Sequence, residues 1–326
     1  MRKYITLALI LVILCIPGVS ALNVVSTTTV LSDPISYIGG DRVRVIAIAD
    51  PTICPHMQGE IIPNRIQMDM DFLASADLFV AINGSVDKEY VMPYVNKFMA
   101  ANHNTNISWK TLEDPSMVWN TPEGAHTLAQ ESASWLIGAD PKNQTYYEER
   151  LASYNAQIDA TDPSREERSR IAGLDVIVML WQKEAAEEWL GLNVVSVFAP
   201  DFYNNGQSTP RAVINDIFDH PEKYRNVKYV IENMQSGDMA KGITEALHDN
   251  GIPAERVIFT NFPGSVAGAD TLPGVLQYNK GLVTPSAAST AARGTSALPS
   301  PLGVETAMIG MGILFVGLHY RRKEEQ

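Results

Sequence analysis

Side chains that can bind metals gather in one short loop of the sequence. Residues 50–59 read DPTICPHMQG and bring Cys54, His56 and Met57 together. Imidazole nitrogen is a common ligand for zinc and other transition metals, whereas thiolate and thioether sulfur select soft ions such as Cu(I). Methionine also serves as a gap-filler in protein cores, so this loop predicts either a metal site or a locally packed turn.

The sequence lacks the motifs of common enzyme classes. It contains no G-x-S-x-G nucleophile elbow, no phosphate-binding loop, no H-E-x-x-H zinc motif and no paired-cysteine motif. The pair Glu187-Glu188 and the charged run 165–170 are typical of solvated helix faces. A base, a nucleophile and a substrate pocket cannot be assembled from these residues, so we do not expect an enzyme.

Composition narrows the range of partners. The chain has 326 residues and is 45% hydrophobic, which is enough for one large or two medium folded domains. Its formal net charge is −12, which argues against nucleic-acid binding, because that needs clustered Lys and Arg, and favours cations. Only Cys15 and Cys54 could form a disulfide, too few for a disulfide framework.

The N-terminal residues 1–21 have the pattern of a secretory signal peptide. A basic start is followed by an apolar run from Ile5 to Ile16 and by small residues before Leu22. Cys15 lies in this segment behind Leu14, where a lipidation site would need a small residue, so we do not expect a lipid there. Sequons at Asn83, Asn106 and Asn143 are consistent with an exported surface.

The C-terminal region predicts a tether and an anchor. Residues 284–302 are rich in Ser, Ala and Pro, residues 303–320 contain an apolar run, and residues 321–326 are basic. We expect an external domain held by a C-terminal membrane anchor with a cytoplasmic tail. Two alternatives remain: a sorting signal that is cut and replaced by lipid, and a last core helix.

Between the two ends, strands and helices alternate in two blocks. Expected strands are residues 23–30, 43–49, 78–83, 174–180, 193–198, 229–232 and 256–260. Residues 122–172 are mostly helical, with Thr121 as N-cap and breaks at 138–141 and at Asp162-Pro163. We therefore predict an α/β fold with two doubly wound lobes, residues 22–121 and 173–283, joined by a long rigid helix. Its ligand cleft would lie between the lobes.

Several short motifs follow one another in a familiar order. They are NVVSTTTVLSD at 23–33, IGGDRVRV at 38–45, Pro55-His56, SADLFV at 75–80, Asn83-Gly84, Asp140-Pro141, YYE at 146–148, GLNVV at 191–195, Glu232, Asp270 and QYN at 277–279. With this order and spacing, the sequence resembles the solute-binding proteins of zinc- and manganese-type ABC importers. The resemblance covers roughly residues 22–283.

In that family, four side chains from both lobes hold the metal. The resemblance implies His56 as the first ligand, in its Pro-His pattern, and Asp270 as the fourth, nine positions before Asn279. The segments that would carry the second and third ligands read 114-DPSM-117 and 179-MLW-181 here, without a matching ligand. Candidate additional or replacement ligands are Cys54, Met57, Met117 and Glu232.

The resemblance implies an extracellular receptor that captures a divalent transition metal, zinc or manganese, with copper as a further option. It would deliver the metal to an ABC permease and its ATPase subunit. One alternative is the same fold with a soft metal such as Cu(I) or another small ligand as cargo. Another is a cell-surface structural or adhesive protein that has lost the metal site.

Overall fold

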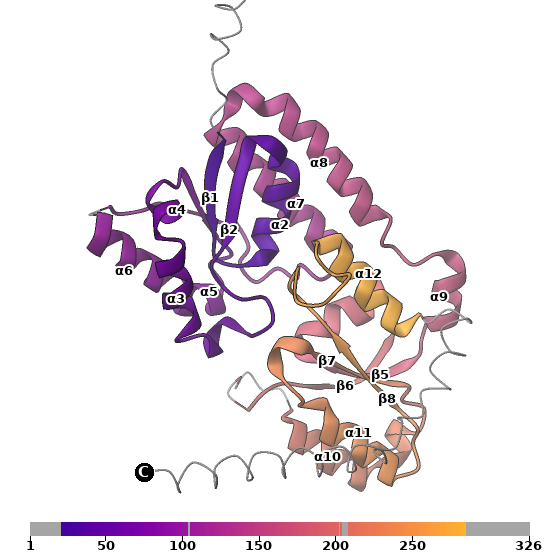
Figure 1. The fold of residues 1–326 in the computed structure, drawn as a ribbon. Helices are drawn as coiled ribbons and strands as arrows, with labels where there is room; N and C mark the ends of the chain where they lie inside the picture. Colours follow the sequence, from indigo (N-terminus) through magenta and orange to yellow (C-terminus); the bar gives the residue numbers. More distant parts are fainter. Residues whose placement is uncertain (1–20, 104, 202, 204–207, 285–326) are drawn as a thin grey trace, which may run out of the picture. The chain divides into compact units, whose positions relative to one another are not determined.

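A computed structural model describes residues 21–103, 105–201, 203 and 208–284 (Figure 1). These residues belong to one compact unit that ends at Thr284. The expected signal peptide, tether, anchor and basic tail lie outside the described residues, apart from Ala21 and Thr284. No helix in the described part of the chain is long and apolar enough to cross a membrane.

The N-terminal lobe is built on a parallel four-stranded sheet. Its strands are β1 Leu22–Ser26, β2 Val43–Ala47, β3 Leu78–Ala81 and β4 Trp109–Thr111, in the order β2-β1-β3-β4. Every residue of β3 is buried, as expected for a strand of a sheet covered on both faces. The helices of this lobe are α2 Thr29–Gly39, α3 Ile61–Met68, α4 Met70–Ala74, α5 Ser85–Tyr90 and α6 Met92–His103.

The C-terminal lobe repeats this strand order. Its strands are β5 Asp175–Met179, β6 Asn193–Phe198, β7 Tyr229–Asn233 and β8 Glu255–Phe259, in the order β6-β5-β7-β8, and all pairs are parallel. Its helices are α10 Pro210–Asp219, α11 Ala240–Asp249 and α12 Leu272–Val283, and a π-helix covers Ala185–Trp189. In both lobes the strand order changes direction between the first and third strands in sequence, that is, between β1 and β3 and between β5 and β7. Ligands of such sheets usually bind at this point.

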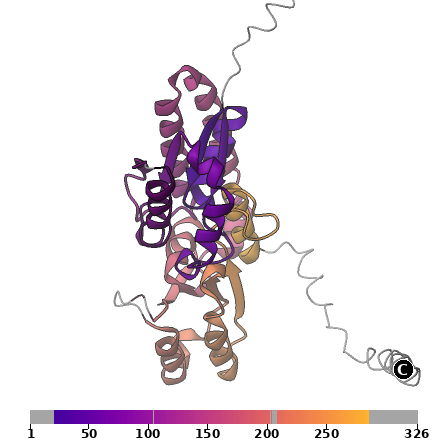
Figure 2. The ribbon, with the colours of Figure 1, turned by 60° about the vertical axis from the view of Figure 1, so that its left-hand side comes forward.

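The connector consists of three helices rather than one. They are α7 Pro122–Ala139, α8 Gln144–Asp159 and α9 Arg165–Ile171, with breaks where the sequence indicated them. Helices α7 and α8 lie side by side in both views (Figures 1 and 2). Thr121 caps α7 by accepting a hydrogen bond from the backbone N–H of Gly124 at 3.1 Å. A paired connector is stiffer than a single helix, because each helix packs against its neighbour.

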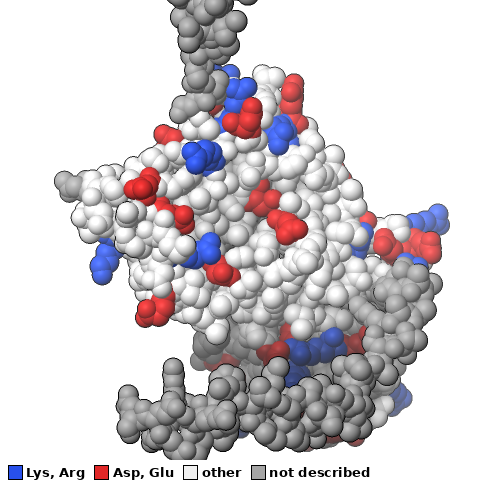
Figure 3. Space-filling view, in the orientation of Figure 1, with Lys and Arg blue, Asp and Glu red and all other residues white. Residues whose placement is uncertain are grey.

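One hydrophobic core runs through both lobes and the connector. It joins Val24 and Val80 of the first sheet, Leu128 of α7, and Val176 and Phe259 of the second sheet. Two smaller clusters lie under the outer helices, one in each lobe. Acidic and basic side chains are interspersed on the face shown in Figure 3. The fold is the predicted α/β fold of two parallel-sheet lobes.

Candidate functional site

His56 lies in a short 3-10 helix, Pro55–Met57, in the loop after β2. Its ring is half-buried and meets the ring of Tyr90 in α5 edge-on, with centroids 6.1 Å apart. Burial lowers the pKa of His56 and so favours the neutral imidazole. The neutral form is the one that coordinates a metal.

Gln58 holds this loop in shape and was not singled out from the sequence. Its fully buried carboxamide accepts a hydrogen bond from the N–H of Asp50 at 2.8 Å. It donates to the carbonyls of Asp50 at 2.8 Å and Ile53 at 2.6 Å. One neutral side chain therefore satisfies three backbone groups and fixes the turn that presents His56.

The two sulfur side chains of the loop differ in environment. Cys54 is half-buried, and burial raises the pKa of its thiol, so the metal-binding thiolate is disfavoured. Met57 is 63% exposed on the protein surface. These features weaken the case for a soft-metal site built on this loop.

Asp270 is exposed in the loop between β8 and α12. The next residue, Thr271, caps α12 by accepting a hydrogen bond from the N–H of Gly274 at 3.1 Å. One residue further, the N–H of Leu272 donates to the carboxylate of Asp33 in α2 at 2.6 Å. The segment that carries Asp270 is therefore anchored on the N-terminal lobe.

The loops that carry His56 and Asp270 meet through Gln235, which follows β7. Its side chain donates to the carbonyl of Pro51 and to the hydroxyl of Thr260, both at 3.0 Å. Among the described residues, however, no group of three or more His, Cys, Asp or Glu side chains is arranged to hold a metal ion. The fold thus links the two loops, but these residue types do not form a complete ligand set.

The segments in place of the second and third ligands supply other side chains. In the first, the exposed carboxylate of Asp114 accepts hydrogen bonds from the N–H and the hydroxyl of Ser116 at 2.9 and 2.6 Å. Met117 is half-buried and packs against the main core. In the second segment, Met179 is fully buried in the C-terminal lobe. These two methionines therefore serve as packing residues in this structure.

Glu232 is fully buried and is engaged on both carboxylate oxygens. One oxygen accepts from the N–H of Ala240 at 2.7 Å, and the other pairs with the guanidinium of Arg256. Burial raises the pKa of Glu232, while Ala240 and Arg256 oppose the rise. A metal at this carboxylate would have to displace Arg256 or the N–H of Ala240, so Glu232 acts here as a partner in a structural ion pair.

Neutral carboxamides connect the two lobes at their contact. We call Asn120, Gln182, Gln235 and Asn261 the carboxamide cluster; all four are buried. The amide of Asn120 donates to Gln182 at 2.8 Å and to Asn261 at 3.1 Å, and Gln182 donates to Asn261 at 2.9 Å. Gln235 accepts from the N–H of Asn261 at 3.3 Å. The cluster lies next to the segments that lack metal ligands, and its residues show no motif by which the sequence reveals them.

A cavity of about 800 Å³ lies beside this contact, between the start of α7 and residues 180–189. Its carboxylates outnumber its cations five to two; they belong to Glu123, Asp162, Glu184, Glu187 and Glu188. Burial raises the pKa of Glu184, and the charges of Glu123 and Glu188 add to the rise. The lining of the cavity is therefore acidic, as is the chain as a whole.

Comparisons with known proteins agree with this architecture. A family model described as zinc-uptake complex component A, periplasmic, matches residues 24–280. The chain belongs to this family. Because its members are solute receptors of ABC transporters, the prediction that the chain is not an enzyme is confirmed.

Individual relatives have low sequence identity to this chain, but the similarity covers most of its length. The metal ABC transporter substrate-binding lipoprotein ScbA of Streptococcus cristatus is 25% identical over 75% of this chain and 81% of its own length. The manganese ABC transporter substrate-binding lipoprotein ScaA of Streptococcus gordonii is 24% identical over 74% of this chain and 81% of its own length. The solved structure of the periplasmic zinc-binding protein TroA from Treponema pallidum superposes with a TM-score of 0.60. It is 11% identical and covers 81% of this chain and 98% of that chain, which supports the fold.

Proposed function

We propose that this protein is the receptor component of an ABC importer, which captures a divalent transition metal outside the cell membrane and delivers it to a permease and its ATPase subunit. The observation that carries this proposal is the family match, which spans both lobes and the connector. The net charge of −12 favours a cationic cargo.

The proposed ligands are His56 and Asp270, one on each lobe. Their chemistry suits zinc or manganese, since an imidazole and a carboxylate serve both ions. The relatives support the same cargo: one is named for manganese, and one solved structure for zinc. Burial raises the pKa of the Cys54 thiol, Met57 is exposed, and Met117 packs against the main core, so Cu(I) is the less favoured cargo.

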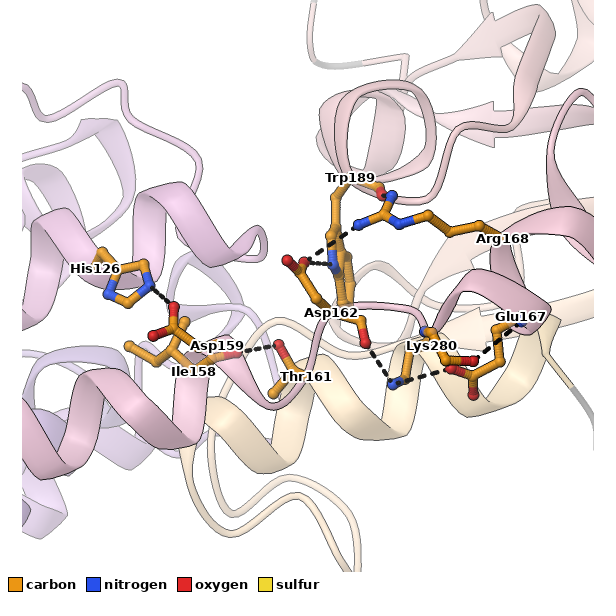
Figure 4. Close-up of polar contacts among 10 residues, drawn as sticks. His126, Ile158, Asp159, Thr161, Asp162, Glu167, Arg168, Trp189 and Lys280 are labelled. Carbon is orange, nitrogen blue, oxygen red and sulfur yellow. Dashed lines mark hydrogen bonds and ion pairs between the residues drawn. The ribbon is translucent and has the colours of Figure 1, made fainter.

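The junction of connector and C-terminal lobe supports delivery with little movement of the lobes (Figure 4). Asp162, between α8 and α9, accepts from the indole of Trp189 at 3.2 Å and pairs with Arg168 at 3.6 Å. Lys280 of α12 reaches the carbonyl of Asp162 at 3.4 Å and the carboxylate of Glu167 at 3.7 Å. With its junction to the C-terminal lobe held by these contacts, the connector resists wide hinge opening, and cargo release would follow from docking on the permease.

Thermal melting with single metals tests the proposal. Mn²⁺ or Zn²⁺ at 100 times its dissociation constant should stabilise the protein by about 2.7 kcal/mol. His56→Ala and Asp270→Asn should remove most of this shift. His103→Ala and Asp219→Asn, which change exposed residues, should retain it.

Other outcomes separate the alternatives. A shift with Cu(I) alone, lost in Cys54→Ser, would replace the divalent cargo by a soft metal. No shift with any metal would contradict the receptor function and favour a structural protein on the same fold.

For the location we propose export by the signal peptide 1–21 and anchoring by the segment 303–320, with residues 284–302 as the tether. The relatives are named lipoproteins, whereas Leu14 before Cys15 disfavours a lipid at that position. Truncation after residue 302 should therefore release the protein from the membrane fraction, and Cys15→Ser should not. Release by Cys15→Ser alone would instead indicate a lipid anchor.

A further inference from the structure

The three Asn-x-Ser/Thr sequons lie in different local structures. Asn143 precedes α8, so the rest of its sequon lies in the first helical turn, and its side-chain amide donates to Asp140 at 2.5 Å. Asn83 is half-buried with φ of +63°, and its backbone N–H donates to the buried carboxylate of Asp87 at 3.2 Å. Both sites are constrained by neighbouring structure.

Asn106 differs on each of these points. Its side chain is exposed, and residues 105–108 form neither helix nor strand before β4 begins. Exposure alternates along the sequon: Asn106 and Ser108 are exposed, whereas Ile107 between them is half-buried and packs against the outer core of the lobe. Within the described part of the chain, no hydrogen bond engages the side chain of either Asn106 or Ser108. The acceptor amide and the hydroxyl of the sequon are thus presented to solvent together.

We propose that Asn106 is the site of an N-linked glycan, an inference that rests on the export proposed above. The donor would be an oligosaccharide joined through phosphate to a lipid. Nδ2 of Asn106 forms a bond to C1 of the first sugar, and the C1–O bond to phosphate breaks. The lipid phosphate leaves with the electron pair, and the proton lost from Nδ2 passes to a base of the transferase. Ser108 completes the motif that the transferase recognises.

The position of Asn106 also gives the glycan a physical effect. Strand β4 pairs with β3 alone among the described strands, so it forms an edge of the first sheet. An edge strand presents unpaired backbone groups that can recruit another chain, and proteins commonly cover or charge such edges. A bulky polar group directly before Trp109 would hinder this pairing.

The experiment uses the full chain purified from the cells that produce it. Peptide mass spectrometry should find the peptide containing Asn106 with a sugar mass added, and the peptides of Asn83 and Asn143 without one. Asn106→Gln and Ser108→Ala should each remove the added mass completely. Asn102→Gln, which changes a nearby exposed asparagine outside any sequon, should retain it.

Export is checked on the same sample by the mass of the N-terminal peptide. A bare Asn106 in protein that has lost residues 1–21 would overturn the proposal while leaving export intact. A glycan on Asn83 or Asn143 with Asn106 bare would overturn it as well. The metal-induced melting shift of Asn106→Gln should equal that of the wild type, which separates this site from the receptor function.

Discussion

Burial shifts the protonation of individual side chains in ways that their place in the sequence does not indicate. His56 and Cys54 lie two positions apart, yet burial favours the neutral form of both, which suits an imidazole ligand and disfavours a thiolate ligand. Asp33 shows the effect of burial on a carboxyl group. Burial raises its pKa to about 6, against hydrogen bonds from Leu272 and Tyr154.

The pKa of Asp33 predicts a pH-dependent stability. Because the folded state holds this proton to a higher pH than the unfolded chain does, the free energy of unfolding falls as pH rises from about 4 to about 6. A shift of this size corresponds to ~3 kcal/mol. Urea unfolding between pH 4 and 7 should show the wild type losing stability relative to Asp33→Asn by about this amount. Parallel curves for the two proteins would contradict the assignment, and Asp219→Asn serves as the control.

At the scale of elements, the last helix of the connector, α9, has a well-formed N-terminal cap. Ser164 begins α9 with a capping box: its hydroxyl accepts from the N–H of Glu167 at 3.2 Å, and the carboxylate of Glu167 accepts from the N–H of Ser164 at 2.7 Å. Glu167 also pairs with Lys280 of α12. The cap therefore fixes both the helix start and its contact with the last helix of the lobe.

Removing this cap should lower the free energy of unfolding more than removing another hydroxyl of α9. Ser164→Ala should lower the free energy of unfolding by about 1 kcal/mol, because an orphan N–H of the first turn loses its partner. Ser169→Ala, on the same helix, should change it by less than about 0.5 kcal/mol. Denaturant unfolding measures both variants, and equal effects would show that the cap is not the stabilising contact.

At the scale of the whole described molecule, the lobes share one core. Leu128 of α7 lies in a cluster with residues of both sheets and with Leu276 of α12. Two hydrogen bonds cross the same contact: the N–H of Leu272 donates to the carboxylate of Asp33, and the indole N–H of Trp119 donates to the carbonyl of Asn261. Separate unfolding of one lobe would expose this shared apolar surface, so the two lobes should unfold together.

Leu128→Ala tests the shared core. The substitution should destabilise the protein by about 2–5 kcal/mol through the cavity it leaves. Hydrogen exchange followed by mass spectrometry should show peptides of β1 and β5 losing protection at the same denaturant concentration. Leu247→Ala, in the outer cluster of the C-terminal lobe, should shift that same single transition. Two separate transitions in either variant would contradict a shared core.

The sequence by itself determined the alternation of strands and helices, the two lobes, the helical connector with its breaks, and the family. These follow from local patterns: apolar runs, caps such as Thr121, and short motifs in order. It did not predict β4, because this three-residue edge strand carries too few residues for a periodic signal. It also extended β1 to residue 30, although α2 begins at Thr29.

Only the tertiary structure decided how the lobe contact is made. Asp33 and Leu272 are 239 positions apart, and the carboxamides of Asn120, Gln182 and Asn261 carry neither charge nor periodicity that would link them in a sequence. The sequence likewise does not link Glu232 to Arg256. Their ion pair in the fold makes Glu232 a structural residue rather than a candidate ligand. Hydrogen bonding and burial depend on which side chains meet in space, and that is settled by packing of the whole chain.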